Sequence, residues 1–492
     1  MDFLDPNKKR LRTRKLFIMY FFAGIGIILS SLILLYITFG YKFDSSTREI
    51  VKNGLIFTDS SPTSSSIYIN GKQKGETEER FTVPEGKYNI ELRKEGYISW
   101  KKTINLGGGK IERLIYPKLI PSKLTTAESK NYIGNPTFST ESLDRKKIVI
   151  ATPNSVSNFD IFDTSKPEDP AKTIDIPQSI YSTPKNVSTE KLKLVEWASD
   201  NKHFLVKHFY DDKFEFVVIN IDEPAESVNI NKLHGFNPIS ILLRDKKHDQ
   251  LYIQKEDLSL NIATTKNVEI TPILQNVSNF KTNRDNIVIY STNDPKTPDK
   301  TNVKILLDDD TYNIATFTKS EMFLDIVEFD DDWSAVVVSK TEGKMSIFND
   351  PFHKKDKKPL NNLRAFKSLN IVNPTELSFS TTVRFALAQS STNLAIYDFE
   401  DHKKFEYKFD TPLANEQLAN WMDGHRLLIT KDNKVQLFEF DNHNKTSLVT
   451  INTDSEPFFD RDYLRIFTLA PTKNNPGNSS LTRTSLKVGL KN

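Results

Sequence analysis

Residues 197–206 read WASDNKHFLV, and this stretch contains the pattern on which the fold of most of the chain depends. A tryptophan is followed by a polar turn around Asp200 and then by the apolar run Phe204 to Val206. A second apolar run, Phe216 to Ile219, follows another polar turn. Short apolar runs bounded by polar turn residues are typical of buried β-strands. The stretch therefore predicts two successive strands of a sheet.

The same order of features recurs further along the chain. Trp333 to Val338 leads to Met345 to Phe348, and Trp421 to His425 leads to Val435 to Phe438. From about residue 130 onward there is no helix-period stretch of useful length, and eight apolar runs stand out: Ile148 to Ala151, Phe204 to Val206, Leu251 to Ile253, Ile287 to Tyr290, Ala335 to Val338, Phe385 to Ala388, Leu427 to Ile429 and Leu464 to Phe467. Their spacing is close to the roughly 40 to 50 residues of a propeller blade.

Residues 130–490 are therefore expected to form a β-propeller of seven or eight blades, with eight preferred. Radial stacking would bury both faces of each small sheet against its neighbours. The stretches at Trp197 and Trp421 resemble the blade signature of bacterial β-propellers related to the WD-repeat and TolB-like groups. Leu481 to Leu490 is a candidate closing strand. A tandem of β-sandwiches is the structural alternative, because sandwiches also contain short strands and frequent turns.

A smaller β-rich segment precedes this region, at residues 55–121. Tyr68 to Thr77 reads YINGKQKGET, in which Asn70-Gly71 is a strong hairpin signal because a type I′ turn needs positive φ at both central residues. Together with Ser61-Pro62, Pro84-Glu85-Gly86, Gly96-Tyr97, Trp100 and Leu119-Ile120-Pro121, this stretch resembles the PEGA domain. The resemblance implies a small β-sandwich that acts as a surface-exposed interaction or spacer module without enzymatic activity. Lys87 and Glu78 depart from the family pattern, where alanine and often proline stand.

The N-terminal region predicts a membrane anchor. Phe17 to Phe39 contains no charged residue and would span roughly 34 Å as a helix, enough for a hydrocarbon core of about 30 Å. Basic residues are crowded in the tail 1–16 and sparse in the linker 40–54, which predicts a cytoplasmic N-terminus and extracytoplasmic C-terminal domains. A cleaved secretory signal is the alternative, although its apolar region is normally only about 7 to 15 residues long.

Composition limits the chemistry that this chain is expected to perform. It has 492 residues, no cysteine and a net charge of +3, so disulfides and thiolate metal sites are excluded and nothing indicates a nucleic-acid surface. The eight histidines show no compact metal-ligand spacing, and the odd offset between His203 and His208 places them on opposite faces of a strand. Acidic runs at 308–310 and 330–332 are interpreted as solvated turns rather than calcium sites. Trp197, Trp333 and Trp421 are expected first as core residues, with sugar stacking as the alternative.

No catalytic, cofactor-binding or metal-binding residues are therefore assigned, and no cofactor is expected. The favoured function is that of a single-pass protein of the bacterial cell envelope, with a non-enzymatic binding or scaffold role. Its expected partners are the lipid bilayer and an envelope protein or glycan. The alternative is an extracytoplasmic enzyme, a glycan or peptide hydrolase or lyase with its site in the propeller channel. Convergent carboxylates or histidines with perturbed pKa values in that channel would favour the enzyme.

Overall fold

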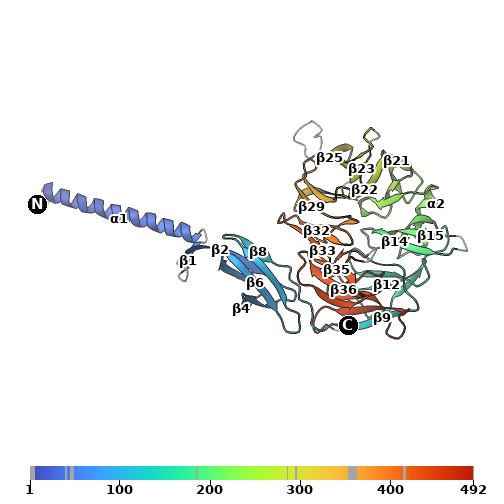
Figure 1. Cartoon of the computed structure of the whole chain (residues 1–492), viewed down its shortest axis with the longest axis horizontal. Coiled ribbons are helices and arrows are strands. Elements are labelled where there is room, and N and C mark those ends of the chain that lie inside the picture. The colour runs from blue at the N-terminus through green and yellow to red at the C-terminus, as the bar shows by residue number, and fades with distance from the viewer. Residues whose placement is uncertain are drawn as a thin grey trace. The chain divides into compact units, whose positions relative to one another are not determined.

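The computed structural model describes residues 6–38, 41–44, 49–183, 187–284, 286–293, 296–352, 363–413 and 417–490. The chain divides after Lys123 into two compact units, which are described separately. The first contains a long helix and a small β domain, and the second is built almost entirely of strands (Figure 1).

The first element is the helix α1 (Pro6–Thr38). Its part from Arg10 to Thr38 contains an 18-residue window with a mean hydropathy of 2.4 and is long and apolar enough to cross a membrane, by length and composition. None of its apolar window is buried against other described residues. A signal sequence near the N-terminus would meet the same criterion. Phe39, the last residue of the predicted span, lies outside the described residues.

The small β domain consists of two four-stranded sheets. One sheet is formed by β1 (Tyr41–Asp44), β2 (Glu49–Thr58), β5 (Arg80–Pro84) and β8 (Ile111–Leu114). The other has the order β4-β3-β6-β7, with β3 (Ser66–Ile69), β4 (Lys72–Glu76), β6 (Gly86–Arg93) and β7 (Trp100–Leu106). Ile56 of the first sheet and Ile67, Leu92 and Trp100 of the second are buried, so the apolar faces of the strands form the core.

The predicted hairpin turn joins β3 to β4. Asn70 and Gly71 have φ of 50° and 79°, the positive values that a type I′ turn requires. The Asn70 side chain also accepts a hydrogen bond from the backbone N–H of Asn89 at 2.8 Å, which ties the turn to β6. Glu78 has φ of 77°, which a proline ring excludes, so the backbone here cannot be that of a proline-containing turn.

The second unit contains eight four-stranded antiparallel sheets, counted over the described residues. Blades 1 to 4 are formed by β10 (Ser139–Glu141), β11 (Lys147–Ala151), β12 (Asn158–Asp163) and β13 (Lys172–Asp175); β14 (Glu190–Trp197), β15 (His203–Tyr210), β16 (Lys213–Asn220) and β17 (Val228–Asn229); β18 (Ser240–Leu243), β19 (Gln250–Gln254), β20 (Leu260–Thr264) and β21 (Ile270–Leu274); and β22 (Val277–Asn283), β23 (Ile287–Thr292), β24 (Lys300–Leu307) and β25 (Asp310–Thr318).

Blades 5 to 8 are formed by β26 (Met322–Phe329), β27 (Asp332–Ser339), β28 (Lys344–Asn349) and β29 (Lys367–Asn370); β30 (Glu376–Phe379), β31 (Phe385–Gln389), β32 (Asn393–Asp398) and β33 (Lys404–Lys408); β34 (Asn420–Trp421), β35 (Arg426–Lys431), β36 (Lys434–Glu439) and β37 (Thr446–Thr450); and β38 (Phe458–Phe459), β39 (Arg465–Pro471), β40 (Ser479–Ser485) and β9 (Thr125–Tyr132). Three short helices, η1 (Pro224–Glu226), α2 (Ile230–His234) and η2 (Arg244–Lys246), lie in connections.

The sheets are arranged in a ring (Figure 1). The ring is closed by β9, a strand at the beginning of the second unit. β9 pairs antiparallel with β40, from Thr125 opposite Ser485 to Tyr132 opposite Ser479. Of the predicted closing segment, Leu481 to Ser485 thus belongs to the third strand of blade 8, and β9 supplies the fourth strand. The unit is an eight-bladed β-propeller, and the tandem of β-sandwiches is excluded.

The eight apolar runs of the sequence have one structural role. Each contributes to the second strand of a blade, which is covered by neighbouring blades on both faces. Phe204 of β15 illustrates the packing: its ring contacts Phe138 and Phe159 of blade 1 and Trp197 of its own blade, with centroids 4.8 to 6.3 Å apart. Burial on both faces explains why these runs are continuously apolar rather than alternating.

Candidate functional site in the propeller channel

A cavity of about 1150 Å³ lies where the first strands of several blades converge. It is lined by residues of β10, β14, β30, β34 and β38 and of the loops beside them, so these first strands are the inner strands of the ring. A ligand pocket typically has about 300 to 1,000 Å³. The central channel is therefore large enough to hold a small molecule or a segment of a polymer.

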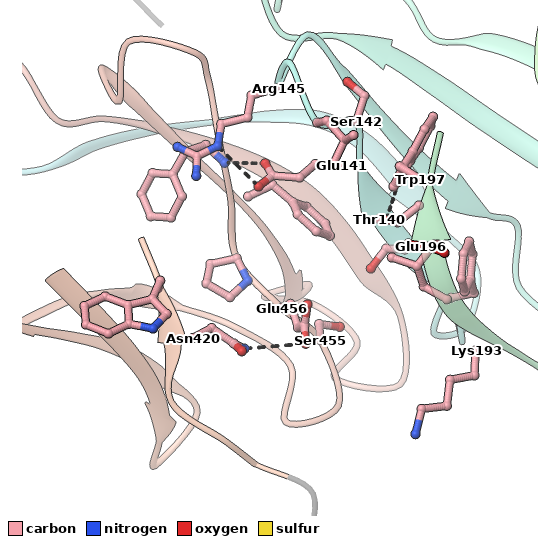
Figure 2. A pocket seen from close by; sticks show the side chains of 18 of the residues that line it. Thr140, Glu141, Ser142, Arg145, Lys193, Glu196, Trp197, Asn420, Ser455 and Glu456 are labelled. Atoms are coloured by element: carbon pink, nitrogen blue, oxygen red, sulfur yellow. Dashed lines mark hydrogen bonds and ion pairs between the residues drawn. The ribbon is translucent and has the colours of Figure 1, made fainter. Parts of the chain in front are cut away.

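Glu141 ends the inner strand of blade 1 and projects into this channel (Figure 2). Its carboxylate lies 3.7 Å from the Arg145 guanidinium and accepts a hydrogen bond from the backbone N–H of Phe459 at 3.2 Å. The side chain is 26% exposed to the channel, but the surrounding protein removes most of its hydration. This desolvation outweighs the attraction of Arg145 and raises the pKa of Glu141 to about 7.

Two more glutamates line the same cavity, Glu376 on β30 and Glu456 in the loop before β38. Glu376 accepts a hydrogen bond from the Gln389 amide at 3.1 Å, and Glu456 accepts one from Asn420 at 3.5 Å. Burial raises the pKa of both carboxyls. The charge of Glu456 also raises the pKa of Glu376 and of Glu141. Glu456 is thus close enough to Glu141 and to Glu376 to repel each of them when ionised.

Blade 2 contributes positive charge to the same cavity. Lys191 and Lys193 lie on the inner strand β14, and both are exposed where they line the channel. The pairing of β14 with β15 shifts register between Leu194 and Glu196, as at a β-bulge, and Glu196 forms an ion pair with Lys246 of blade 3. The channel therefore has an acidic wall from blades 1, 6 and 8 and a basic wall from blade 2.

The three blade tryptophans have different environments. Trp197 is buried, and its indole N–H donates to the Thr140 hydroxyl of blade 1 at 2.9 Å, which confirms a core position. Trp333 begins the second strand of its blade and packs partly buried beside Phe352. Trp421 lines the channel while its ring stacks on Phe385. Of the three, Trp421 has the position from which it could contact a ligand.

The arrangement of the channel matches one expectation of an enzyme. Carboxylates with raised pKa values converge in it, as the alternative function requires. A carboxyl group with a pKa near 7 can donate or accept a proton at neutral pH. The same groups, with Asn420 and Trp421, also provide hydrogen-bonding and stacking surfaces for a polar ligand.

The remaining polar motifs of the sequence lie outside the channel. The acidic runs 308–310 and 330–332 are exposed turns between β24 and β25 and between β26 and β27. His208 is buried and pairs with Glu215 at 3.0 Å, whereas His203 contacts Asp200 at 2.7 Å, so the two histidines have separate surroundings. The fold also brings His248 next to Asp200, at 3.0 Å. Sequence spacing could not show this neighbour, because it comes from another blade.

Residues 53–117 match the family model of the PEGA domain. No curated protein matches the chain.

Solved structures with a similar arrangement include the Dos1 propeller, with 10% identity, a TM-score of 0.47 and coverage of 75% of this chain and 96% of that one. Another is an oligogalacturonate lyase from Vibrio parahaemolyticus, with 12% identity, a TM-score of 0.37 and coverage of 74% of this chain and 100% of the lyase chain. A third is the Cps50 (Swd1) propeller domain of Myceliophteria thermophila, with 11% identity, a TM-score of 0.38 and coverage of 66% and 99%. The chain combines a domain of the PEGA type, at residues 53–117, with the eight-bladed β-propeller described above.

Proposed function

We propose that this chain is a membrane-anchored binding protein of a bacterial cell envelope and that its propeller channel holds part of an envelope protein or glycan. In this proposal α1 spans the membrane once with the N-terminus in the cytoplasm, and the PEGA-type domain connects α1 to the propeller along the chain. The charge asymmetry around the apolar segment supports this orientation. Loops on a rigid scaffold commonly carry binding sites, and proteins of one fold can have unrelated functions.

The observation that carries the binding role is the channel itself. It combines a volume of about 1150 Å³ with hydrogen-bonding groups on opposite walls. In the hydrogen bonds described above, the donors to Glu376 and Glu456 are side-chain amides. A ligand with a positive charge or hydroxyl groups would add further partners for these two carboxylates. Lys191 and Lys193 favour an anionic group on the same ligand. A peptide segment or a charged glycan provides this combination.

Binding is tested with the full-length chain in detergent on arrays of envelope glycans and peptides. The informative variant is the double substitution Glu376→Gln and Glu456→Gln, which preserves side-chain size and removes both charges. Glu226→Gln, an exposed position outside the channel lining, is the matched control. The proposal expects a ligand that binds the unchanged chain and the control but binds the double variant at least about tenfold more weakly. Equal binding to all three proteins would exclude the channel as the binding site.

The proposed topology has its own test, independent of the ligand. Protease added to intact cells, or to spheroplasts if an outer membrane is present, should degrade the PEGA-type domain and the propeller. Protection of both units in such cells, with degradation only after lysis, would place them on the cytoplasmic side.

An enzymatic role is the second candidate, and Glu141 is the observation that favours it. Its pKa of about 7 suits a general acid or base, and Glu376 and Glu456 line the same cavity. Mass spectrometry of each bound glycan or peptide, after incubation with the protein, tests this directly. Shortened products that disappear with Glu141→Gln, while binding persists, would identify a hydrolase or lyase. Intact ligands with every variant would leave binding as the function.

A further inference from the structure

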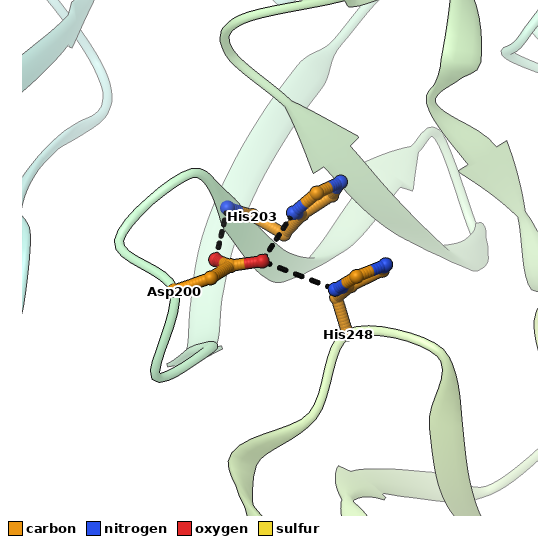
Figure 3. Close-up of side chains that lie close together, drawn as sticks. All are labelled: Asp200, His203 and His248. Atoms are coloured by element: carbon orange, nitrogen blue, oxygen red, sulfur yellow. Dashed lines mark hydrogen bonds and ion pairs between the residues drawn. The ribbon is translucent and has the colours of Figure 1, made fainter.

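Asp200, His203 and His248 form a cluster on loops of two neighbouring blades (Figure 3). Asp200 lies in the turn between β14 and β15, and His203 is the first residue of β15. His248 lies in the connection between η2 and β19 of blade 3. The three residues meet because blades 2 and 3 pack against each other, so neither blade contains the cluster alone.

Each of the three side chains offers one nitrogen or oxygen atom, and these atoms all lie within 4.8 Å of one another. Asp200 Oδ2 lies 2.7 Å from Nδ1 of His203 and 3.0 Å from Nδ1 of His248. The two imidazole rings are parallel, with centroids 3.9 Å apart and an interplanar angle of 10°. Figure 3 shows that this stacking places both Nδ1 atoms on the side of the carboxylate.

The carboxylate is held in place by the backbone around it. Asp200 Oδ1 accepts hydrogen bonds from the N–H groups of Lys202 and His203, at 2.8 and 3.0 Å. These bonds occupy one oxygen and direct the other toward the imidazoles. Hydrogen bonds of this kind commonly orient a metal-ligating carboxylate and tune its affinity.

Other contacts also join the loop of blade 2 that contains Asp200 to the connection of blade 3 that contains His248. The backbone N–H of Ser199 donates to the carbonyl of Lys246 at 2.8 Å, and Lys246 forms an ion pair with Glu196. The cluster is thus assembled on a preformed contact between blades. Lys202 is paired with Asp222 at 3.0 Å. Two of the three lysines beside the cluster in sequence, Lys202 and Lys246, therefore have carboxylate partners, which reduces their repulsion of a cation. The third, Lys247, is exposed to solvent.

We propose that Asp200, His203 and His248 bind a divalent transition-metal ion, with Zn²⁺ as the ion that fits best. Zinc accepts imidazole nitrogen and carboxylate oxygen at about 2.0 to 2.2 Å, and in a tetrahedral site such ligand atoms are about 3.3 Å apart. The present Oδ2–Nδ1 separations of 2.7 and 3.0 Å would need to increase by about 0.6 and 0.3 Å. The two rings would also turn out of their parallel stack, because an imidazole nitrogen binds a metal in the plane of its ring. The absence of cysteine removes thiolates that would compete for the ion.

Access to the site is open, because the side chains of His203, Asp200 and His248 are 13%, 30% and 40% exposed. Three protein ligands would leave at least one coordination position for water or a ligand atom. The ion would also connect blade 2 to blade 3, so its binding should stabilise the propeller.

The test uses the full-length chain in detergent, purified without a polyhistidine tag and stripped of metal with a chelator. Equilibrium dialysis against Zn²⁺, with metal analysis of the retained protein, should give one ion per chain. The visible spectrum of Co²⁺ in its place should show a site of low coordination number. Zn²⁺ should also raise the melting temperature of the unchanged protein.

Two variants remove one ligand each, His248→Ala and Asp200→Asn. Each should weaken Zn²⁺ binding by at least the roughly 10- to 100-fold typical of lost outer-shell partners. The control is His443→Ala, because His443 stands 3.3 Å from a single carboxylate, Asp441, and should leave binding unchanged. Circular dichroism confirms that each variant is folded. Failure of the unchanged protein to retain Zn²⁺, or equal retention by folded His248→Ala, would overturn the proposal.

Discussion

Replacing Glu141 by glutamine removes an ionisable group from the channel while preserving its shape. In the folded protein the pKa of Glu141 is raised from 4.5 to about 7 by desolvation. A raised folded-state pKa stabilises the protein below the unfolded pKa, and this contribution is lost as the pH rises through the folded value. Ionisation of Glu141 should therefore destabilise the unchanged protein progressively between about pH 5 and pH 8, and Glu141→Gln should abolish that component.

The size of the effect follows from the shift. One pKa unit corresponds to 1.36 kcal/mol, so a shift from 4.5 to about 7 represents about 3 kcal/mol. Since the side chain is 26% exposed, we expect about 2 to 3 kcal/mol. The propeller unit has an unfolding entropy of about 0.8 kcal/mol/K, from roughly 2.1 cal/mol/K per residue. The melting temperature of the variant relative to the unchanged protein should thus rise by about 3 °C between pH 5 and pH 8.

Thermal unfolding of the full-length chain, followed by circular dichroism at a series of pH values, measures this difference. The change with pH is the quantity of interest, because replacing the carboxyl by an amide also alters stability by an amount that does not depend on pH. Glu226→Gln, on the exposed helix η1, provides the control and should give a constant difference. A difference for Glu141→Gln that stays within about 1 °C across the range would refute the conclusion that this carboxyl is desolvated.

Three further predictions concern the packing inside each of the two units. Thr140→Val leaves the buried indole N–H of Trp197 without its acceptor and should lower the free energy of unfolding by about 1 to 3 kcal/mol. In a Trp197→Phe background, the same change should have little further effect, as a double-mutant cycle of melting temperatures would show. Leu481→Ala creates a cavity beside the closing strand and should cost about 2 to 5 kcal/mol, read as earlier thermal unfolding of the propeller. Gly71→Val forces a β-branched residue to φ of 79° and should speed hydrogen exchange in β3 and β4, whereas exchange in the propeller should stay unchanged.

The sequence was sufficient to predict the strands whose environment is uniform. The runs around Phe204, Ala335 and Phe385 are apolar on both faces because each is the second strand of a blade, and their spacing revealed the repeat. The closing strand β9 was harder to recognise, because an outer strand such as TTAESKNY alternates weakly and its partner is far away in sequence.

The channel and the histidine cluster depend on contacts that no local pattern encodes. Glu141, Glu376 and Glu456 come from three blades, and their proximity follows only once the ring is closed. Trp421 has nearly the same sequence context as Trp197 but is only partly buried where it lines the channel, whereas Trp197 is buried. His203 and His248 are brought together by blade packing. Sequence reasoning could identify the residue types but not which of them meet.

The pairing of β9 with β40 has a consequence for how the protein is made. The two strands are about 350 residues apart, so at synthesis rates of roughly 5 to 20 residues per second β9 waits about 20 to 70 s for its partner. During that interval neither the first blade nor the nascent edge of the last one has its final neighbour. Newly made chains therefore pass through an open arc of blades in which the strand edges at both ends are unpaired. Such edges can bind a chaperone or pair with a second nascent copy of the chain.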